Sequence, residues 1–198
     1  MIYDKGILER LYHERDIPWD LGKPYKQLVD YVNENSPCRA LDVGCGTGTD
    51  AIFLKQRGFD VSAIDISGEA IKIAKSKARK ERVNIDFKVG DVLDMPFGNE
   101  TFEFVNDNGC FHLLDKLVWK KFVEEVARVM KSKARYLMKC FSDKEPPSPK
   151  IPYRLSQETI QQYFSPRFDI LYIKDIQIEG KYRNHKGYSC LMERLEFH

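Results

Sequence analysis

The sequence predicts an α/β fold: a doubly wound, mostly parallel sheet of seven strands with an antiparallel hairpin at its C-terminal edge. Two observations lead to this fold class. Between residues 40 and 141, short apolar runs alternate with amphipathic segments, and such alternation favours parallel strands joined by helices. After residue 141, two strand-like runs are separated only by KYRNHKG, a connection short enough to join antiparallel neighbours.

The first half of the chain supplies elements on both sides of a glycine-rich turn. Leu28 and Val32 share one helical face, and Ser36-Pro37 ends that helix. An apolar run then stops at glycines, as a buried strand does, and Ser67 is suited to cap a later helix. The elements expected here are a helix over 24–35, a strand over 39–43, a helix over 49–57, a strand over 60–65 and a helix over 67–80.

The second half completes the sheet. The runs NIDFKV and TFEFVN are short and rich in β-branched and aromatic residues, whereas the segment after Trp119 is strongly amphipathic. The expected elements are strands over 84–89 and 101–106, a helix over 119–130, a strand over 135–141, a helix over 156–164 capped by Ser156, and strands over 168–178 and 187–195.

The chain of 198 residues is long enough for one domain and short for two. Within that single domain, 1–198, we expect an N-terminal helical cap over 1–36, a ligand-binding core over 37–141, and a lid segment with the C-terminal strands over 142–198. The lid begins with SDKEPPSPKIP, whose four prolines exclude a helix interior or a central strand.

Composition narrows the class of protein. Lys plus Arg is 32 and Asp plus Glu is 30, so the net charge of +2 gives no reason to expect a nucleic-acid partner. No apolar run approaches the roughly 20 residues that span a bilayer, and the charged N-terminus is unlike a secretory signal. The five cysteines are odd in number and lack metal-ligand spacing. We therefore expect a cytoplasmic protein with no membrane association and no structural metal.

The densest chemical signal is the run LDVGCGTG at 41–48. A strand ends, Gly44, Gly46 and Gly48 follow at alternate positions, and a helix begins. Glycines permit sharp turns and let a ligand approach the main chain, while the helix start offers free N–H groups to a carboxylate or phosphate. A bare turn without a ligand is the alternative interpretation of this run alone.

A second signal follows 21 positions after Gly44, where Asp65 closes the next strand. A carboxylate at that place can accept hydrogen bonds from both hydroxyls of a ribose. The alternative is an Asp that only caps the following helix. Together the turn and Asp65 predict a site for an adenosine-containing cofactor, and they leave nicotinamide cofactors and S-adenosylmethionine both open.

Three further features favour S-adenosylmethionine. The dinucleotide pattern G-x-G-x-x-G requires a glycine where this chain has Thr49. Asp42 precedes the glycines inside the strand, where it can orient the loop. Asp91 follows the third strand, placed to accept a hydrogen bond from an adenine amino group, and Val92 offers its N–H to the ring.

With these motifs the chain resembles the class I S-adenosylmethionine-dependent methyltransferases over most of its length. The resemblance rests on LDVGCGTG at 41–48, Asp65-Ile66-Ser67, GDVLDMPF at 90–97 and the strand at 102–105. It implies a Rossmann-like sheet with S-adenosyl-L-methionine as cofactor and S-adenosylhomocysteine as product. The implied cofactor residues are Trp19, Asp42, Gly44, Gly46, Gly48, Asp65, Ile66, Asp91, Val92 and Asn108. Glu103 and the glycine-free KSKA at 131–134 depart from the family pattern.

The acceptor is harder to predict. The chain lacks the Asn/Asp-Pro-Pro-Tyr motif of methyltransferases that act on amides and bases of macromolecules. Asp107-x-Gly109-x-x-His112 and IPWDLGKP at 17–24 instead resemble small-molecule methyltransferases of the thiopurine, halide/thiol and tellurite-resistance type. The resemblance implies that Trp19 packs near the sulfonium; an anchoring core aromatic is the alternative.

His112 is the expected catalytic residue. It would orient the acceptor or take its proton, although it also fits a satisfied histidine at a helix start. The predicted acceptor residues come from the two ends of the chain and from the turn beside His112, and they are Tyr12, Phe111, Tyr153 and Arg154. The predicted function is methyl transfer to a small-molecule acceptor. A protein or RNA acceptor, a non-catalytic cofactor-binding subunit and a nicotinamide-dependent oxidoreductase remain alternatives.

Overall fold

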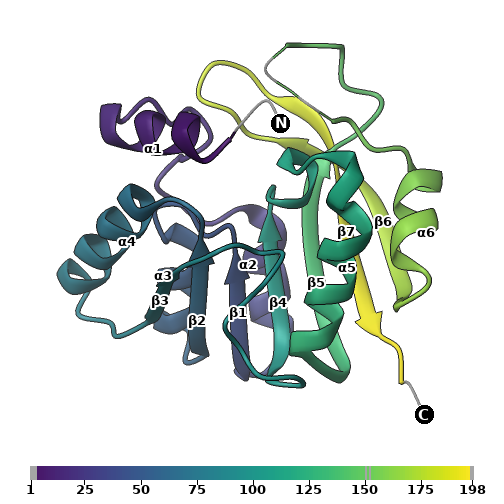
Figure 1. Cartoon of the computed structure of the whole chain (residues 1–198), viewed down its shortest axis with the longest axis horizontal. Helices are drawn as coiled ribbons and strands as arrows, with labels where there is room; N and C mark the ends of the chain where they lie inside the picture. The colour runs from purple at the N-terminus through teal and green to yellow at the C-terminus, as the bar shows by residue number, and fades with distance from the viewer. Residues whose placement is uncertain (1–3, 150, 152, 197–198) are drawn as a thin grey trace.

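A seven-stranded sheet crosses the molecule in the order β3-β2-β1-β4-β5-β7-β6 (Figure 1). The computed structural model describes residues 4–149, 151 and 153–196, so residues 1–3 of the predicted cap lie outside it. The strands are β1 (Arg39–Val43), β2 (Asp60–Asp65), β3 (Asp86–Val89), β4 (Phe102–Asn108), β5 (Met130–Phe141), β6 (Phe168–Ile178) and β7 (His185–Arg194). The helices are α1 (Lys5–Glu14), α2 (Lys26–Glu34), α3 (Thr49–Gln56), α4 (Gly68–Lys80), α5 (Trp119–Val129) and α6 (Gln157–Phe164).

Six of the seven described strands point the same way, and β7, the last strand of the chain, runs in the opposite direction. β1 pairs in parallel with β2 and β4, and the parallel pairing continues to β3 on one side and β5 on the other. β7 is antiparallel to both β5 and β6. This confirms the predicted doubly wound sheet with its antiparallel edge hairpin. The chain order reverses between β1 and β4, which is where open α/β sheets bind ligands at their carboxyl ends.

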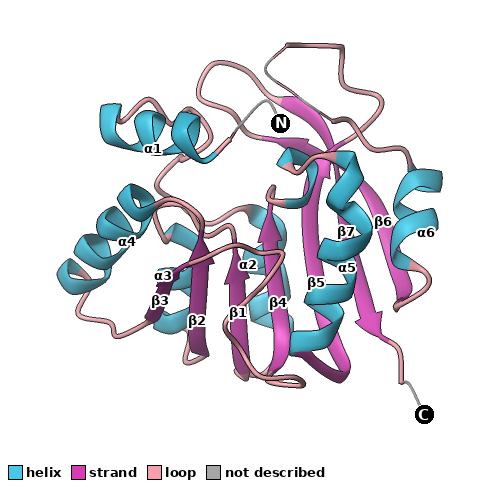
Figure 2. Ribbon diagram, viewed as in Figure 1, coloured by secondary structure: helices cyan, strands magenta, loops and turns pink. Residues whose placement is uncertain are grey.

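Helices cover both faces of the sheet (Figure 2). Alternate residues of each strand face opposite sides, so Leu41 and Val43 of β1 join one apolar core while Ala40 joins the other. The first core packs against α5 and α6, and the second packs against α2, α3 and α4. None of the helices in the described ranges is long and apolar enough to cross a bilayer.

The start of β5 differs from the prediction. We expected a helix to residue 130 and a strand from 135, but α5 ends at Val129 and β5 begins at Met130. Met130 pairs with Phe102, and the next pair in the register joins Phe104 to Arg135. The additional residues bulge from β5, and Lys133 takes a left-handed φ of 61° where the family pattern has glycine. The strand starts early because Met130, which is buried, already pairs with β4 before the bulge.

Three segments lie above the carboxyl ends of the parallel strands (Figure 1). They are α1, the segment 142–155 and the connection between β6 and β7. Short turns of 3-10 helix at Phe111–Leu113 and Lys116–Val118 link β4 to α5 on the same side. This edge of the sheet is therefore the covered one, and it contains every motif that the sequence singles out between β1 and β4.

Candidate active site

The glycine turn joins β1 to α3 and adopts a conformation that favours glycine. Gly44, Gly46 and Gly48 have φ angles of 61°, 52° and 77°, all in the left-handed region. A Cβ on Gly44 would lie 2.8 Å from Cys110, and a Cβ on Gly46 would lie 2.9 Å from the hydroxyl of Tyr12. The first two glycines thus form a narrow cradle of bare main chain below the covering segments.

Asp65 holds this cradle in place. Its Oδ2 accepts a hydrogen bond from the Gly46 N–H at 2.8 Å, and its Oδ1 accepts one from the Ser67 N–H at 2.9 Å. Burial raises the pKa of Asp65, and the two N–H groups oppose that rise. Ser67 also caps α4 as predicted, since its Oγ accepts from the Ala70 N–H at 3.1 Å. Ile66, between them, is half-buried.

The structure brings Asp91 to the end of the strand next to Asp65. The Gly90 N–H donates to the Asp65 carbonyl at 3.0 Å, which ties the two strand ends together. Asp91 is exposed, and its Oδ1 accepts from the Leu93 N–H at 2.8 Å, whereas the side chain of Val92 is buried. The two acids predicted to hold an adenosine therefore lie at neighbouring strand ends beside the glycine turn.

A buried polar network extends from the glycine turn towards β4. Asn106 donates to Asp42 Oδ1 at 2.7 Å and accepts from the Tyr25 hydroxyl at 2.7 Å. Asn108 donates to Asp50 Oδ2 at 2.6 Å. Among the described residues, Asp42 Oδ2 and Asp50 Oδ1 are buried without a hydrogen-bond partner. Burial raises the pKa of both carboxyl groups. The two unpartnered oxygens can accept hydrogen bonds from a ligand.

The sequence did not reveal Tyr25 or Asp50 as parts of this network. Asp50 directly follows Thr49 in the first turn of α3, where an acidic residue is ordinary. Tyr25 precedes α2 and reaches Asn106 across 81 positions of the chain. Neither contact has a local signal, because both depend on how α2 and α3 pack against the sheet.

On the opposite face of β4, Asp107 shapes the turn that carries His112. Its carboxylate accepts from the Cys110 N–H at 2.6 Å, the Phe111 N–H at 3.2 Å and the Tyr136 hydroxyl at 2.7 Å. Burial raises the pKa of Asp107 to about 6, although these three hydrogen bonds lower it. Asp107 therefore stabilises the turn that carries His112.

His112 is buried, with 5% of its surface exposed, and its ring packs against Phe141 at a centroid distance of 4.7 Å. Burial, with a smaller contribution from Lys139, lowers the pKa of His112 to about 3. Its Nδ1 has no hydrogen-bond partner among the described residues. A base this weak cannot hold a proton near neutral pH, which argues against the predicted role of proton acceptor.

The N-terminal segment covers the cradle. Tyr12 of α1 is buried over Gly46, and its ring meets the edge of Trp19 at a centroid distance of 6.1 Å. Trp19 is 44% exposed, which differs from an anchoring core aromatic. Next to it, Asp20 accepts hydrogen bonds from Thr47 at 2.5 Å and from Lys77 at 3.0 Å. The predicted acceptor residue Tyr12 thus lies on the glycine turn itself.

The other predicted acceptor residues are spread over the front of the molecule. Phe111 is 1% exposed and packs in the core against Trp119. Tyr153 packs on Trp119 at 5.0 Å and accepts from the Lys116 N–H at 3.3 Å. Arg154 is exposed and donates to the carbonyls of Asp143 and Glu145 at 3.4 and 2.7 Å. These contacts stabilise the covering segment, and only Tyr153 lies against the turn that follows His112.

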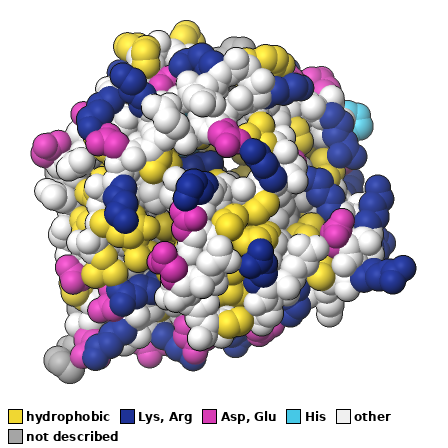
Figure 3. Space-filling model, turned by 180° about the vertical axis from the view of Figure 1, so that it is seen from behind, with side chains coloured by type: hydrophobic (Ala, Val, Ile, Leu, Met, Phe, Trp, Pro, Cys, Tyr) yellow, Lys and Arg dark blue, Asp and Glu magenta, His cyan; other side chains and the backbone are white. Residues whose placement is uncertain are grey.

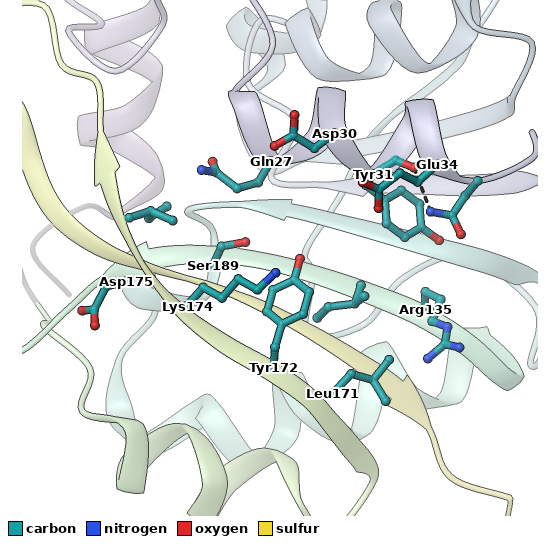
Figure 4. A pocket seen from close by; sticks show the side chains of 13 residues that line it. Gln27, Asp30, Tyr31, Glu34, Arg135, Leu171, Tyr172, Lys174, Asp175 and Ser189 are labelled. Carbon is teal, nitrogen blue, oxygen red and sulfur yellow. Dashed lines mark hydrogen bonds between the residues drawn. The ribbon is translucent and has the colours of Figure 1, made fainter.

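A cavity of about 480 Å³ lies elsewhere, on the back of the molecule. Figure 4 shows side chains of α2 facing those of β6 and β7 across it, among them Asp30, Tyr172 and Lys174. The cavity opens on the sheet face rather than at the carboxyl ends of the strands. It is thus distinct from the cradle formed by the glycine turn.

Comparison with known proteins found a matching domain family and several curated relatives. Residues 40–133 match the family described as "Methyltransferase domain". The 2-heptyl-1-hydroxyquinolin-4(1H)-one methyltransferase of Mycobacteroides abscessus is 24% identical over 86% of this chain and 75% of its own length. Four other curated relatives are spanned over only 30% to 55% of their lengths.

Solved structures agree on the fold. A structure from work on thioacetal formation in echinomycin biosynthesis superposes with a TM-score of 0.86 at 24% identity, covering 97% of this chain and 93% of that one. The 1,6-didemethyltoxoflavin-N1-methyltransferase of Burkholderia thailandensis, solved with S-adenosylhomocysteine, gives a TM-score of 0.80 at 15% identity over 97% of this chain and 87% of that one.

Residues 40–133 match a methyltransferase domain, and the chain resembles the class I S-adenosylmethionine-dependent methyltransferases in its fold. The sheet order, the matched domain and the glycine turn with its two acidic strand ends all agree with this class. The residues present also fit the cofactor of the class. At Gly44 and Gly46 the main chain is bare, and a Cβ there would collide with Cys110 or Tyr12. Next to it, Asp42 Oδ2 and Asp50 Oδ1 have no hydrogen-bond partner among the described residues and suit a cationic group.

Proposed function

We propose that this protein transfers a methyl group from S-adenosylmethionine to a small-molecule acceptor by in-line displacement. The cofactor supplies an activated methyl on a sulfonium, so the protein has mainly to position the acceptor. Orientation of this kind lowers a barrier by roughly 7–11 kcal/mol in favourable systems. The observation that carries the proposal is the left-handed glycine turn held by Asp65, with Asp91 at the neighbouring strand end.

In this proposal the cofactor lies across the ends of β3, β2, β1 and β4. Asp91 and Val92 take the adenine, Asp65 and Ile66 the ribose, and the three glycines the amino-acid part. Trp19 lies beside the sulfonium. Asp42 and Asn108 belong to the buried network under the amino group, and the open carboxyl oxygens of Asp42 and Asp50 suit its positive charge. Tyr12 must move from Gly46 when the cofactor enters, because its hydroxyl lies against the cradle.

A small-molecule acceptor is supported by the covering segments and by the relatives. The covering segments, which are α1, the described residues of 142–155 and the β6–β7 connection, lie over the carboxyl ends of the strands (Figure 1), whereas a macromolecular acceptor needs access to these ends. The printed names of curated relatives include a hydroxyquinolone, an ajmaline, a magnesium-protoporphyrin and a ubiquinone-biosynthesis methyltransferase. The back of the molecule interleaves basic with acidic side chains (Figure 3), so a nucleic-acid acceptor is not expected. The free thiols of all five cysteines support a cytoplasmic location.

The first test is cofactor binding by calorimetry. S-adenosylmethionine and S-adenosylhomocysteine should bind saturably, and NAD should not. Asp65→Ala should weaken binding by roughly 1–3 kcal/mol, because it removes the ribose acceptor and loosens the glycine turn. Asp60→Ala, at the opposite and exposed end of β2, is the matched control and should bind like wild type.

Turnover is the second measurement. A panel of thiols, phenols and amines should convert the cofactor to S-adenosylhomocysteine in the presence of the wild-type protein. Binding of NAD alone would refute the methyltransferase assignment, and turnover only with RNA or protein would refute the small-molecule acceptor. Cofactor binding without any turnover would instead support a non-catalytic subunit.

A further inference from the structure

Lys139 lies at the carboxyl end of β5, on the acceptor side of the proposed cofactor site. In the sheet register it is opposite Asn108 of β4 and Ser189 of β7. The adenosine side of the site, with Asp65 and Asp91, lies on β2 and β3 at the other end of the strand order. With the proposed cofactor position, a ligand group beside Lys139 would be separated from the adenosine by β1 and β4, on the side where the acceptor is expected.

The charge of Lys139 is not neutralised by a direct partner. Among the described residues, no carboxylate forms an ion pair with its Nζ, which lies 4.9 Å from the centroid of the Tyr25 ring. Two acidic neighbours bond to other groups: Asp50 accepts from Asn108 through Oδ2, and Glu179 pairs with Lys23 at 2.6 Å. Asp50 Oδ1 has no partner among the described residues. Burial lowers the pKa of Lys139, while Asp50, Asp107 and Glu179 raise it. The half-buried ammonium group therefore forms no ion pair with a described carboxylate.

The neighbouring His112 does not fill the role of a proton acceptor. Its buried ring contacts Phe141, two positions beyond Lys139 on the same strand, and its Nδ1 is unpartnered. Because a histidine in this state is a poor base, an acceptor that must lose a proton needs another device. A fixed positive charge is such a device, since it favours the ionised form of a bound acid.

We propose that Lys139 determines acceptor specificity by binding the ionised nucleophile, so that the acceptors are acidic hydroxyl or thiol compounds rather than simple amines. This inference rests on the proposed function and specifies its acceptor class. The unpartnered His112 nitrogen then orients the same anion or the atoms next to it.

The chemistry balances without a further reactant. The acceptor's O–H or S–H proton leaves to solvent as the anion binds beside Lys139. The anion's lone pair forms the new bond to the methyl carbon while the carbon–sulfur bond of the cofactor breaks, and that electron pair stays on sulfur. The methylated acceptor and S-adenosylhomocysteine are uncharged at the reacting atoms, and Lys139 keeps its proton throughout.

The test uses the full chain loaded with S-adenosylhomocysteine, so that no turnover is needed. The probes are phenol, para-cyanophenol and para-nitrophenol, which are increasingly acidic, and para-nitroaniline, an amine with the skeleton of the last. Binding is followed by calorimetry against pH, and for para-nitrophenol also by the colour of its phenolate. The variants are Lys139→Met, which removes the charge, and Lys139→Arg, which keeps it. Lys131→Met, on the exposed start of the same strand, is the control.

Wild type should bind the phenols as their anions, with a bound pKa below that in water. Lys139→Met should weaken the ionised phenols by about tenfold or more, the scale of a lost hydrogen bond to a charged group, and leave para-nitroaniline unchanged. Lys139→Arg should keep most of the preference, and Lys131→Met all of it.

Two results would overturn the inference. The first is a wild-type protein that shows no preference for the ionised form of any phenol, absence of binding included. The second is a loss of about tenfold in the binding of S-adenosylhomocysteine itself by Lys139→Met, which would assign the ammonium to the cofactor carboxylate. Failure of the proposed function is measured separately, before any phenol is added. In that case the wild-type protein does not bind S-adenosylhomocysteine.

Discussion

At the scale of single residues, the three glycines of the turn serve different ends. A Cβ on Gly48 would lie 2.8 Å from the Cβ of Ala74 and 3.1 Å from the ring of Phe87, both parts of the core. Gly44 and Gly46 instead approach Cys110 and Tyr12, which belong to the covering side of the site. Gly48 is therefore required by the packing of the turn against α4 and β3, and the first two by the open cradle.

Gly48→Ala should lower the free energy of unfolding by roughly 2–4 kcal/mol, because it combines a left-handed alanine with overpacking of the core. Gly22→Ala is a matched comparison: its φ is +68°, but nothing lies within 4 Å of its Cβ position. It should cost only the backbone preference, about 1–2 kcal/mol. Urea unfolding measures both values. Equal losses would show that the close approach at Gly48 carries no energy.

The sequence predicted those site residues that follow strand ends, because strand ends are visible in the hydrophobic pattern. Asp65 and Asp91 were placed in this way, and Asp42 by its position inside the strand before the glycines. The structure brings all three to one edge of the sheet. Lys139 was not predicted, since a lysine within an expected strand resembles an ordinary solvent-facing residue. Its open charge depends on Tyr25 and Glu179, which come from distant parts of the chain.

At the scale of elements, α1 is fastened over the site by one carboxylate. Glu9 accepts from the Ser67 hydroxyl at 2.9 Å and from the N–H groups of Gly68 and Glu69 at 2.8 and 3.0 Å. Burial would raise the pKa of Glu9, but these three donors lower it. A side chain of α1 thus caps the start of α4, where the helix dipole favours a negative charge.

Glu9→Gln should loosen α1 without unfolding the core. Loss of a charged cap costs about 0.5–2 kcal/mol. The amide hydrogens of α1 should therefore exchange about tenfold faster than in wild type. Those of α3, which Glu9 does not contact, should keep their rates. Glu14→Gln, on the exposed end of the same helix, is the control. Unchanged exchange in α1 would mean that Tyr12 and Trp19, rather than Glu9, hold the helix down.

Element positions were predicted best where one residue type marks a boundary. Ser67 and Ser156 cap α4 and α6 as expected, and β6 spans 168–178 as predicted. The start of β5 was wrong by five residues because its bulge contains no glycine or proline to mark it. The Glu9 cap joins residues 58 to 60 positions apart, so no local pattern predicts how α1 docks.

At the scale of the whole molecule, Glu145 joins the segment 142–155 to the β6–β7 hairpin. Its side chain is 1% exposed and accepts from Arg183 at 2.6 Å. It also contacts His185 Nδ1 at 2.9 Å and accepts from the Lys186 N–H at 2.7 Å. The same segment is bound by Lys144 to Asp175 at 2.7 Å and by Asp143 to the Tyr188 hydroxyl at 3.0 Å. The cover above β5 is therefore one unit with the edge hairpin.

This junction makes part of the stability depend on acid. Burial by itself would raise the pKa of Glu145, but the Lys186 N–H, His185 and Arg183 lower it from 4.5 to about 2. Because the folded pKa lies below the unfolded value, the stabilisation is complete above pH 4.5 and is lost as the pH falls towards 2. The shift corresponds to about 3 kcal/mol.

Glu145→Gln should therefore unfold more easily than wild type near neutral pH. The difference in unfolding free energy should shrink by about 3 kcal/mol as the pH falls from 4.5 to below 2. Urea unfolding at several pH values measures this difference. Glu34→Gln, an exposed carboxylate on α2, gives the effect of removing one surface charge. If the difference in unfolding free energy between wild type and Glu145→Gln stays constant with pH, the charge of the carboxylate does not contribute to stability. The segment 142–155 would then be held by the contacts of Lys144 and Asp143 instead.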